Sequence, residues 1–461
     1  MRILLVSTYE LGHQPLHLAS PAARLIRDGH EVECLDLAVE EWDQARFDGA
    51  DLVAFSVPMH TAMRLAVQAA TRLRADRVRV GQRAVPIAFY GLYAAVGADR
   101  TLRSLADRLI VGEYEDELAA WARAHEPDQT SRAMKGPVVV DLGRKTFLAP
   151  ARHLLPGLEK YARLEIEGEA RLAGYVEASH GCRHRCRHCP IPAVYDGRYR
   201  VTGLETVLAD VSALVGMGAR HITFGDPDFL NAPRYAMDVL REANAAFPGL
   251  TFDLTVKVEH IIEHRDLWSD VAAMNVVFIV SAFETTNNKV LEVLDKAHSV
   301  GDMATATRLI RDAGMQIRPS WMPFTPLTEV GDLVDIFDFL VDQDLLAAVD
   351  PVQLSIRLLV PDGSLILSSE MAPYVGRYDP DALTYGWTAR DPQVDDLQAK
   401  LASIAEEEGS DQRGAIGRMW SLVMAGHRIP EWAESRPVRL SESWFCCAEP
   451  TSRQLLRAAA E

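Results

Sequence analysis

Short apolar runs alternate with amphipathic stretches along most of the chain. The runs are four to seven residues long, and the stretches between them carry apolar residues at helical spacing. Strands separated by helices are typical of parallel β-sheets that are covered by helices. We therefore expect an α/β protein, with the alternation divided into two series by a polar stretch.

The two series predict two different architectures. Residues 1–122 fit a Rossmann-like doubly wound domain, and residues 123–170 are expected to form a linker. Residues 171–360 contain six strand–helix units, as in a partial (β/α)6 barrel, whose chemistry lies at the carboxyl ends of its strands. Since domains average about 150 residues, the 461-residue chain has room for a C-terminal domain over residues 361–461.

Charge and composition exclude several classes of protein. The chain has 48 basic and 65 acidic residues, a net charge of −17, which disfavours binding to nucleic acid or to an anionic membrane. No apolar run approaches the roughly 20 residues that span a bilayer, and the apolar run at the N-terminus is too short for a signal-peptide core. We therefore expect a cytoplasmic location. Six cysteines are too few for a disulfide framework.

Three of these cysteines follow the first strand of the second series directly. Cys182, Cys186 and Cys189 are spaced C-x3-C-x2-C. Three thiolates on one loop can each bind a different iron of a 4Fe-4S cluster and leave the fourth iron open for catalysis. The alternative is a zinc site in which His184 or His188 is the fourth ligand.

This spacing at this place resembles the radical S-adenosylmethionine (SAM) superfamily. The resemblance implies that SAM binds the open iron and that an electron from the cluster cleaves its sulfonium. It also implies further cofactor contacts at later strand ends. Asp226, with Asp228 as the alternate, matches an acidic turn that touches the SAM amino group, and Glu284 matches a carboxylate that contacts SAM. Lys296 matches a family lysine in position only.

Simpler readings exist for these carboxylates. A turn that contains proline and aspartate is common structural punctuation, and Glu284 also fits a solvated acid at a helix N-terminus. Two arginines at later strand ends, Arg318 and Arg357, are expected to bind carboxylate groups of SAM or substrate, although surface arginines are common.

Basic residues gather around the cysteines. Five arginines between residues 175 and 200 oppose Glu177 and Asp196, a local charge of about +3. A solvated basic loop is one interpretation. The other is a docking surface for an acidic electron donor such as a flavodoxin or ferredoxin.

The N-terminal domain resembles the cobalamin-binding domains of related radical SAM proteins. Residues 56–58, 90–93 and 111–115 occupy the strand ends that such domains use. The Asp-x-His-x-x-Gly motif that supplies an axial imidazole is missing, because His13 and His17 lack its spacing. The sequence thus favours a cofactor-free domain slightly over a cobalamin site.

Two adjacent cysteines near the C-terminus are further candidates for a chemical role. Cys446 and Cys447 stand in the sequence Trp-Phe-Cys-Cys-Ala-Glu-Pro, which resembles the CUAEP/CCAEP-tail subgroup of radical SAM proteins. Adjacent thiols bind soft thiophilic atoms or exchange disulfides. The alternative is that they are small apolar fillers beside the aromatic residues.

The resemblance implies an enzyme that transfers a SAM-derived group, methyl or 3-amino-3-carboxypropyl, to a small-molecule substrate. The substrate is expected to be a thiophilic metalloid such as arsenic or selenium, held or activated by Cys446 and Cys447. Two alternatives remain open: radical modification of a metabolite with the tail thiols as redox or hydrogen donors, and a non-catalytic metal or cobalamin carrier.

Overall fold

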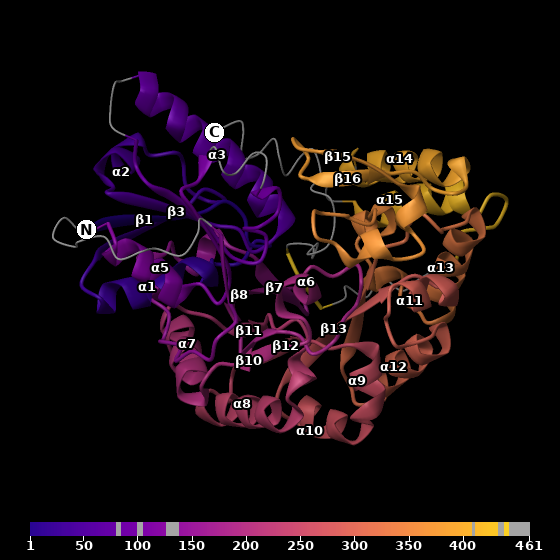
Figure 1. Cartoon of the computed structure of the whole chain (residues 1–461). Helices are drawn as coiled ribbons and strands as arrows, with labels where there is room; N and C mark the ends of the chain where they lie inside the picture. Colours follow the sequence, from indigo (N-terminus) through magenta and orange to yellow (C-terminus); the bar gives the residue numbers. More distant parts are fainter. Residues whose placement is uncertain (80–83, 99–104, 126–137, 408–410, 432–437, 442–461) are drawn as a thin grey trace.

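The computed structural model describes residues 1–79, 84–98, 105–125, 138–407, 411–431 and 438–441. Figure 1 shows the N-terminal sheet and the C-terminal helices side by side above a curled half-barrel. The mixed α/β class predicted from the sequence is confirmed. Within the described part of the chain, none of the helices has the length and apolar character needed to cross a membrane.

The first unit is a six-stranded parallel sheet with the order β2-β1-β3-β4-β5-β6. Its strands are β1 (Arg2–Ser7), β2 (Glu31–Asp36), β3 (Leu52–Ser56), β4 (Ile87–Tyr90), β5 (Arg108–Gly112) and β6 (Val138–Asp141). Its helices are α1 (Leu16–Arg27), α2 (Gln44–Gly49), α3 (His60–Arg79) and α5 (Glu115–Arg123). Separate apolar clusters bury the two faces of the sheet, as a doubly wound fold requires.

The sheet continues into the stretch that we expected to be a linker. β6 pairs with β5 along its whole length, so the first unit includes residues 138–141. The same stretch also contains β7 (Arg163–Ile166) and the short 3-10 helices η2 (Arg152–Leu154) and η3 (Leu158–Lys160). It therefore belongs to both neighbouring sheets.

The second unit is a half-barrel with the strand order β14-β13-β12-β11-β8-β7-β17. Five strands are parallel: β8 (Glu169–Val176), β11 (His221–Phe224), β12 (Thr251–Thr255), β13 (Val276–Glu284) and β14 (Gln316–Trp321). β7 and β17 (Arg439–Leu440) add an antiparallel edge. The outer helices are α7 (Leu204–Gly216), α8 (Pro233–Ala246), α9 (Val258–Glu263), α10 (Trp268–Ala273), α11 (Asn288–Val293), α12 (Val300–Asp312) and α13 (Val330–Asp342).

The expected sixth barrel strand is wrong. Residues 351–355 form a 3-10 helix, η7 (Pro351–Ser355), and a single bridge between Phe324 and Arg357 replaces the ladder. The proline at the first turn favours helical backbone and lacks the N–H that a strand would donate. Instead, Gln353 Oε1 accepts a hydrogen bond of 3.0 Å from Trp321 N, so a side chain satisfies the edge of β14.

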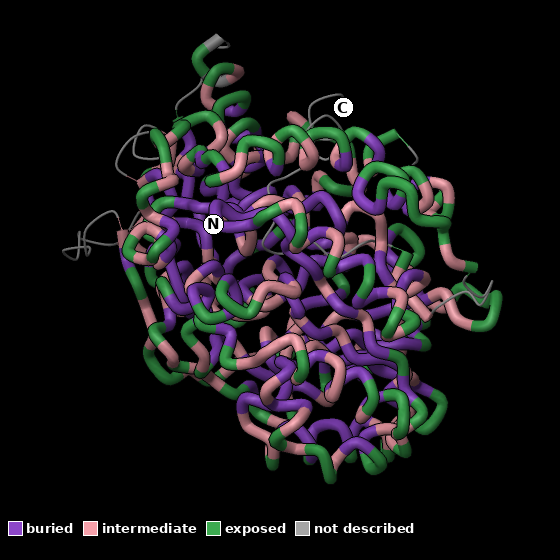
Figure 2. Tube along the Cα trace, turned by 90° about the vertical axis from the view of Figure 1, so that its right-hand side faces the viewer, coloured by how far each residue is buried: buried purple, intermediate pink, exposed green. Residues whose placement is uncertain are grey.

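Residues beyond 360 pack on the half-barrel. β15 (Val375–Asp379) pairs with β16 (Thr384–Trp387), and α14 (Pro392–Glu407) and α15 (Gln412–Val423) follow. Trp387 and Trp420 belong to the same continuous apolar core as the barrel. Leu383 instead joins the core of the first unit, so this hairpin contacts both. Figure 2 shows the buried segments in the interior and the exposed ones at the periphery.

The loop after β8 carries the three cysteines. It begins with β9 (Ser179–Gly181), which pairs with β10 (Tyr199–Val201), and contains α6 (Ile191–Tyr195). We call residues 182–190 the cysteine loop.

Candidate functional site

The three cysteines line one cavity at the carboxyl ends of the barrel strands. Cys182 and Cys186 are buried, and Cys189 is partly exposed. The cavity has a volume of about 1730 Å³, including its open mouth. The structure therefore brings together the residues that the spacing predicted as cluster ligands, at the edge where barrel chemistry is expected.

Hydrogen bonds from backbone N–H groups fix the cysteine loop to the segments that follow β11 and β13. Arg187 N donates to Leu294 O at 2.9 Å, and Arg183 N donates to Asn231 Oδ1 at 3.1 Å. The loop is thus held from the sides of β11 and β13. Such preorganisation is what a metal cluster needs from its ligands.

The donor set fits a multi-iron cluster better than a single zinc ion. Burial raises the pKa of the Cys182 thiol to about 12 and also raises that of Cys186, so a bound cation would be needed to stabilise the thiolates. Among the described residues, some groups of three side chains have all their ligand atoms within 4.8 Å of one another, close enough to hold one metal ion. None of these groups contains a cysteine. A cluster of several irons holds its cysteines farther apart than one ion does.

Glu284 lies at the end of β13, in the wall of the same cavity. Its Oε1 is 2.9 Å from Lys296 Nζ and 3.1 Å from His188 Nε2. Burial opposes ionisation of this carboxyl, but Lys296 and then His188 outweigh it and hold the pKa of Glu284 well below its usual range. Lys296, which matches the family lysine in position only, is thus the partner of Glu284.

The backbone at Glu284 is also unusual. Its φ of 68° lies in the left-handed region, which a residue with a side chain rarely adopts. The ladder between β13 and β14 shifts register at this point. A strained, buried, charged residue at a strand end is typical of functional sites.

Asp226 lies behind the cavity wall. Its neighbours Gly225 and Pro227 line the cavity, whereas its own oxygens accept from Ala178 N at 2.9 Å and from Ser179 Oγ at 2.6 Å. Burial raises the pKa of Asp226 to about 7. In this structure its carboxyl thus supports the strand that leads into the cysteine loop.

Asp228 is fully buried on the far side of the cysteine loop. Its Oδ2 is 2.7 Å from His260 Nδ1 and 3.4 Å from His184 Nε2. Burial opposes its ionisation, but the two imidazoles outweigh burial and lower the pKa of Asp228 strongly. The structure brings Asp228 close to the cysteines but not into the cavity.

The two predicted arginines lie apart from the cysteines. Arg318 lines a second cavity inside the half-barrel, of about 740 Å³, where it pairs with Asp350 at 3.0 Å. Arg357 donates to Asp395 and to Trp387 O, both at 2.9 Å, and stacks on the Trp387 ring. Arg357 therefore ties the C-terminal residues to the half-barrel.

Two of the polar cavity residues that the sequence did not predict lie beside the cysteines. Lys257, after β12, and Gln353, in η7, both line the cavity beside the cysteines. A lysine directly after a barrel strand was the available signal for the first. Gln353 gave none, because the expected strand would have placed it differently.

A charged network joins the N-terminal sheet to the barrel beside the cavity. His17 Nδ1 is 2.9 Å from Glu10 Oε2, and its Nε2 is 3.8 Å from Glu177 Oε1. His180 Nδ1 is 2.9 Å from Glu113 Oε2, and its Nε2 is 3.4 Å from Glu177 Oε2. Glu177 thus links the two units.

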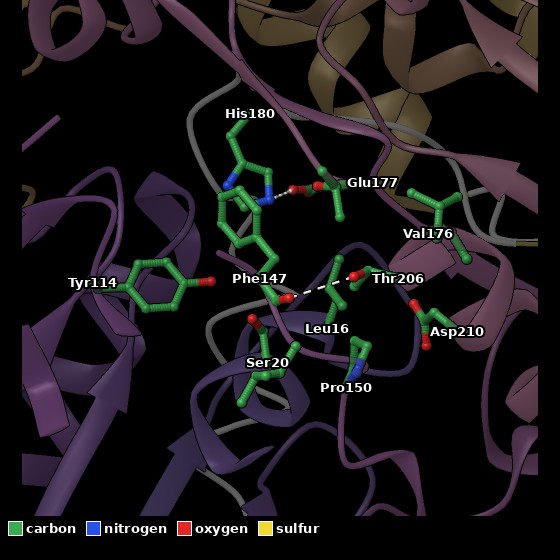
Figure 3. A pocket seen from close by; sticks show the side chains of 13 residues that line it. Leu16, Ser20, Tyr114, Phe147, Pro150, Val176, Glu177, His180, Thr206 and Asp210 are labelled. Atoms are coloured by element: carbon green, nitrogen blue, oxygen red, sulfur yellow. Dashed lines mark hydrogen bonds and ion pairs between the residues drawn. The ribbon is translucent and has the colours of Figure 1, made fainter. Parts of the chain in front are cut away.

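Figure 3 shows a small pocket at the seam between the N-terminal unit and the half-barrel. His180 and Glu177 point toward each other from the barrel, and Tyr114 approaches from the N-terminal unit. Burial would lower the pKa of His17, but Glu10 and Glu177 outweigh it and raise the pKa to about 9. This network could not be predicted from the sequence, because its members lie on segments that meet only when the two sheets dock.

The predicted tail residues, Cys446 and Cys447, lie outside the described residues.

Residues 176–340 match the family model described as the radical SAM superfamily. The match includes all three cysteines, Asp226, Asp228 and Glu284. Residues 176–340 are therefore a radical SAM domain. Proteins of this superfamily use a 4Fe-4S cluster and SAM.

A curated relative extends the likeness beyond the family model. A candidate methylthiotransferase of Methanocaldococcus jannaschii is 21% identical over 273 residues. The match covers 56% of this chain and 57% of that protein. This chain thus spans little more than half the length of its curated relative.

Solved structures share the fold over most of the chain. The cobalamin-dependent SAM radical enzyme OxsB, with aqua-cobalamin bound, has a TM-score of 0.65 at 14% identity and covers 87% of this chain and 66% of its own. The radical SAM methyltransferase TsrM from Kitasatospora setae, with cobalamin and a [4Fe-4S] cluster bound, has a TM-score of 0.57 at 17% identity. That match covers 74% of this chain and 70% of TsrM. At these identities the likenesses show a shared fold.

Proposed function

We propose that this enzyme transfers a SAM-derived carbon group, methyl or 3-amino-3-carboxypropyl, to a small molecule bound between its two units. One observation carries the proposal. The cavity that contains the three cysteines is also lined by N-terminal residues at strand ends, among them Pro58, Leu92 and Gly112. An acceptor held there lies beside SAM, as group transfer requires.

The chain's own residues divide the work by position. Cys182, Cys186 and Cys189 hold the cluster, which when bound supplies the electron that cleaves the SAM sulfonium. Glu284 and Lys296 present opposite charges in the cavity wall and suit the amino and carboxylate groups of methionine. The burial of this pair keeps water from competing with those contacts.

We propose cobalamin as an additional ligand of the N-terminal side of this cavity. Strand ends of the N-terminal unit form this side of the cavity: Pro58, Leu92 and Gly112 line it, and Gly112 has φ of 86°. Size-exclusion chromatography with hydroxocobalamin tests this by its visible absorbance. Absence of co-eluting corrin would favour the cofactor-free domain predicted from the sequence.

Product analysis tests the reaction. Protein purified anaerobically is reduced with SAM, and the products are separated by chromatography. S-adenosylhomocysteine indicates methyl transfer, and methylthioadenosine indicates aminocarboxypropyl transfer. 5′-Deoxyadenosine alone would instead support radical modification of a metabolite, and no SAM cleavage at all would support a carrier. Cys182→Ala should abolish every product and most of the iron.

The metalloid acceptor rests on the tail motif alone. Arsenite and selenite should be converted by the wild type but not by a Cys446→Ala, Cys447→Ala double variant that still cleaves SAM. Equal turnover by both proteins would exclude a role for the tail thiols in holding the acceptor.

An acidic flavodoxin or ferredoxin in the cytoplasm remains the proposed electron donor. Arg183 in the cysteine loop and Arg198 after it are exposed, whereas Arg187 donates to Val293 O at 2.7 Å. Charge reversal at Arg183 and Arg198 should slow reduction by flavodoxin at low salt and leave reduction by dithionite unchanged.

A further inference from the structure

Three side chains from neighbouring strand ends converge behind the cysteine loop. His184 lies on that loop after β8, Asp228 follows β11, and His260 lies on α9 after β12. One donor atom from each lies within 4.8 Å of the other two. Asp228 and His260 are 0% and 2% exposed and the His184 side chain is 15% exposed, so the group is largely shielded from water.

The arrangement of these atoms does not satisfy them by hydrogen bonds. In the described part of the chain, Asp228 Oδ2, His184 Nε2 and His260 Nδ1 are buried and make no hydrogen bond of acceptable geometry. Yet Oδ2 is 2.7 Å and 3.4 Å from the two nitrogens. Buried polar atoms that lie this close together without hydrogen bonds imply a missing partner.

The remaining atoms of the group orient it for that partner. Lys257 N is 3.4 Å from Asp228 Oδ1, which leaves Oδ2 for another contact. Glu259 Oε2 is 3.5 Å from His184 Nδ1, on the opposite side of the ring from Nε2. A carboxylate behind an imidazole fixes the tautomer whose other nitrogen is a ligand, as in many metal sites.

We propose that His184, Asp228 and His260 bind a divalent transition metal ion, with zinc as the expected occupant. Two imidazoles and one carboxylate, with a position left for water, are a common zinc donor set. Zinc lies about 2.0–2.1 Å from such donors, which places them about 3.3 Å apart in a tetrahedron. The 3.4 Å pair already has this spacing, and the 2.7 Å pair must open by about 0.6 Å.

This ion is separate from the cluster proposed for the cysteines. It would join the ends of β8, β11 and β12, and it would hold the cysteine loop through His184, which stands between Cys182 and Cys186. Its expected role is to position that loop.

Metal analysis of the cluster-loaded enzyme tests the proposal. Anaerobic protein is given one equivalent of zinc chloride and desalted, and zinc and iron are counted by mass spectrometry. We expect one zinc retained per chain with the iron unchanged. X-ray absorption at the zinc edge should show nitrogen and oxygen neighbours only. Sulfur neighbours, or no retained zinc, would overturn the proposal, and this outcome is independent of whether the enzyme cleaves SAM.

Variants locate the ion. Asp228→Asn and His260→Gln should each weaken zinc retention at least tenfold and leave the iron in place. His264→Gln is the matched control, because His264 is the neighbouring histidine of a different donor group with His260 and Glu263. Zinc lost on His264→Gln but kept on Asp228→Asn would contradict the assignment. If a variant does not fold, the absorption spectrum of the wild type still decides.

Discussion

At the residue scale, the cavity wall depends on one buried ion pair. The Glu284 and Lys296 side chains are 8% and 4% exposed, and neither can turn to water. Burial would lower the pKa of Lys296, but Glu284 and Cys186 outweigh it and raise the pKa above its usual value. Each charge is therefore stabilised mainly by its neighbours, and removal of one exposes the other to the cost of burial.

We expect Lys296→Met to destabilise the protein by about 3–5 kcal/mol, since it leaves the Glu284 carboxylate with only His188. Urea unfolding measures the change. Arg241→Met is the control: its pair with Asp238 is more than half exposed and should contribute less than about 1 kcal/mol. Equal effects of the two substitutions would show that the buried pair is not coupled.

At the same scale, the glycine at the end of β5, Gly112, lets β5 and β6 approach each other closely. Gly112 and Gly29 have nearly equal φ, 86° and 88°, but a Cβ at Gly112 would lie 2.3 Å from Asp141 O, whereas one at Gly29 meets nothing within 4 Å. Gly29→Ala should cost about 1 kcal/mol from backbone strain alone. Gly112→Ala should cost roughly 2–4 kcal/mol, because β6 must also move. Urea midpoints that coincide would contradict this.

At the scale of elements, one buried arginine fastens the segment between the two units. Arg152 in η2 makes bidentate contacts of 2.8 and 2.9 Å to Asp210 of α7. It also donates to Tyr175 O of β8 at 2.6 Å and to Gln14 O at 3.3 Å. A segment without long helices or strands is thereby fixed to both sheets.

We expect Arg152→Leu to lower stability by about 3–5 kcal/mol, because Asp210 is then buried without a counter-charge. The double variant Arg152→Leu, Asp210→Leu should regain part of that loss, since no charge is left unpaired. Thermal unfolding of the single and double variants measures both. A double variant less stable than the single one would show that the guanidinium acts through its other contacts.

The same scale explains which elements the sequence could predict. The alternation of apolar runs predicts β1–β5 and the five parallel barrel strands, because each buries its own residues against helices next to it in the chain. The prediction of a sixth barrel strand is wrong because Pro351 begins a 3-10 helix there, and because the Gln353 side chain accepts the hydrogen bond from the edge of β14. Assigning β6 to the first sheet required knowing that it pairs with β5.

The candidate site also has features that the sequence could predict and features that it could not. Cysteine spacing is local, so Cys182, Cys186 and Cys189 could be placed at the mouth of the barrel from the sequence. Contacts between loops are not local. Asp226 lies behind the wall because it contacts Ala178, 48 residues earlier in the chain. Arg357 stacks on Trp387, 30 residues later.

At the scale of the whole molecule, stability should depend on pH through the seam between the two units. His17 is protonated in the folded protein up to a pKa of about 9, whereas an unfolded histidine titrates near 6.5. Its contribution is therefore fully present below pH 6.5 and is lost as pH rises through 9. We expect a loss of roughly 2–3 kcal/mol across this window.

His17→Gln isolates that contribution. His180, whose pKa burial would lower but Glu113 raises to about 10, also titrates at the seam, and it is common to both proteins. The difference in unfolding free energy between wild type and His17→Gln should thus be largest at pH 6 and shrink toward pH 9.5. A difference that stays constant with pH would mean that Glu10 and Glu177 do not hold a charged His17, and that apolar contacts dominate the docking of the two sheets.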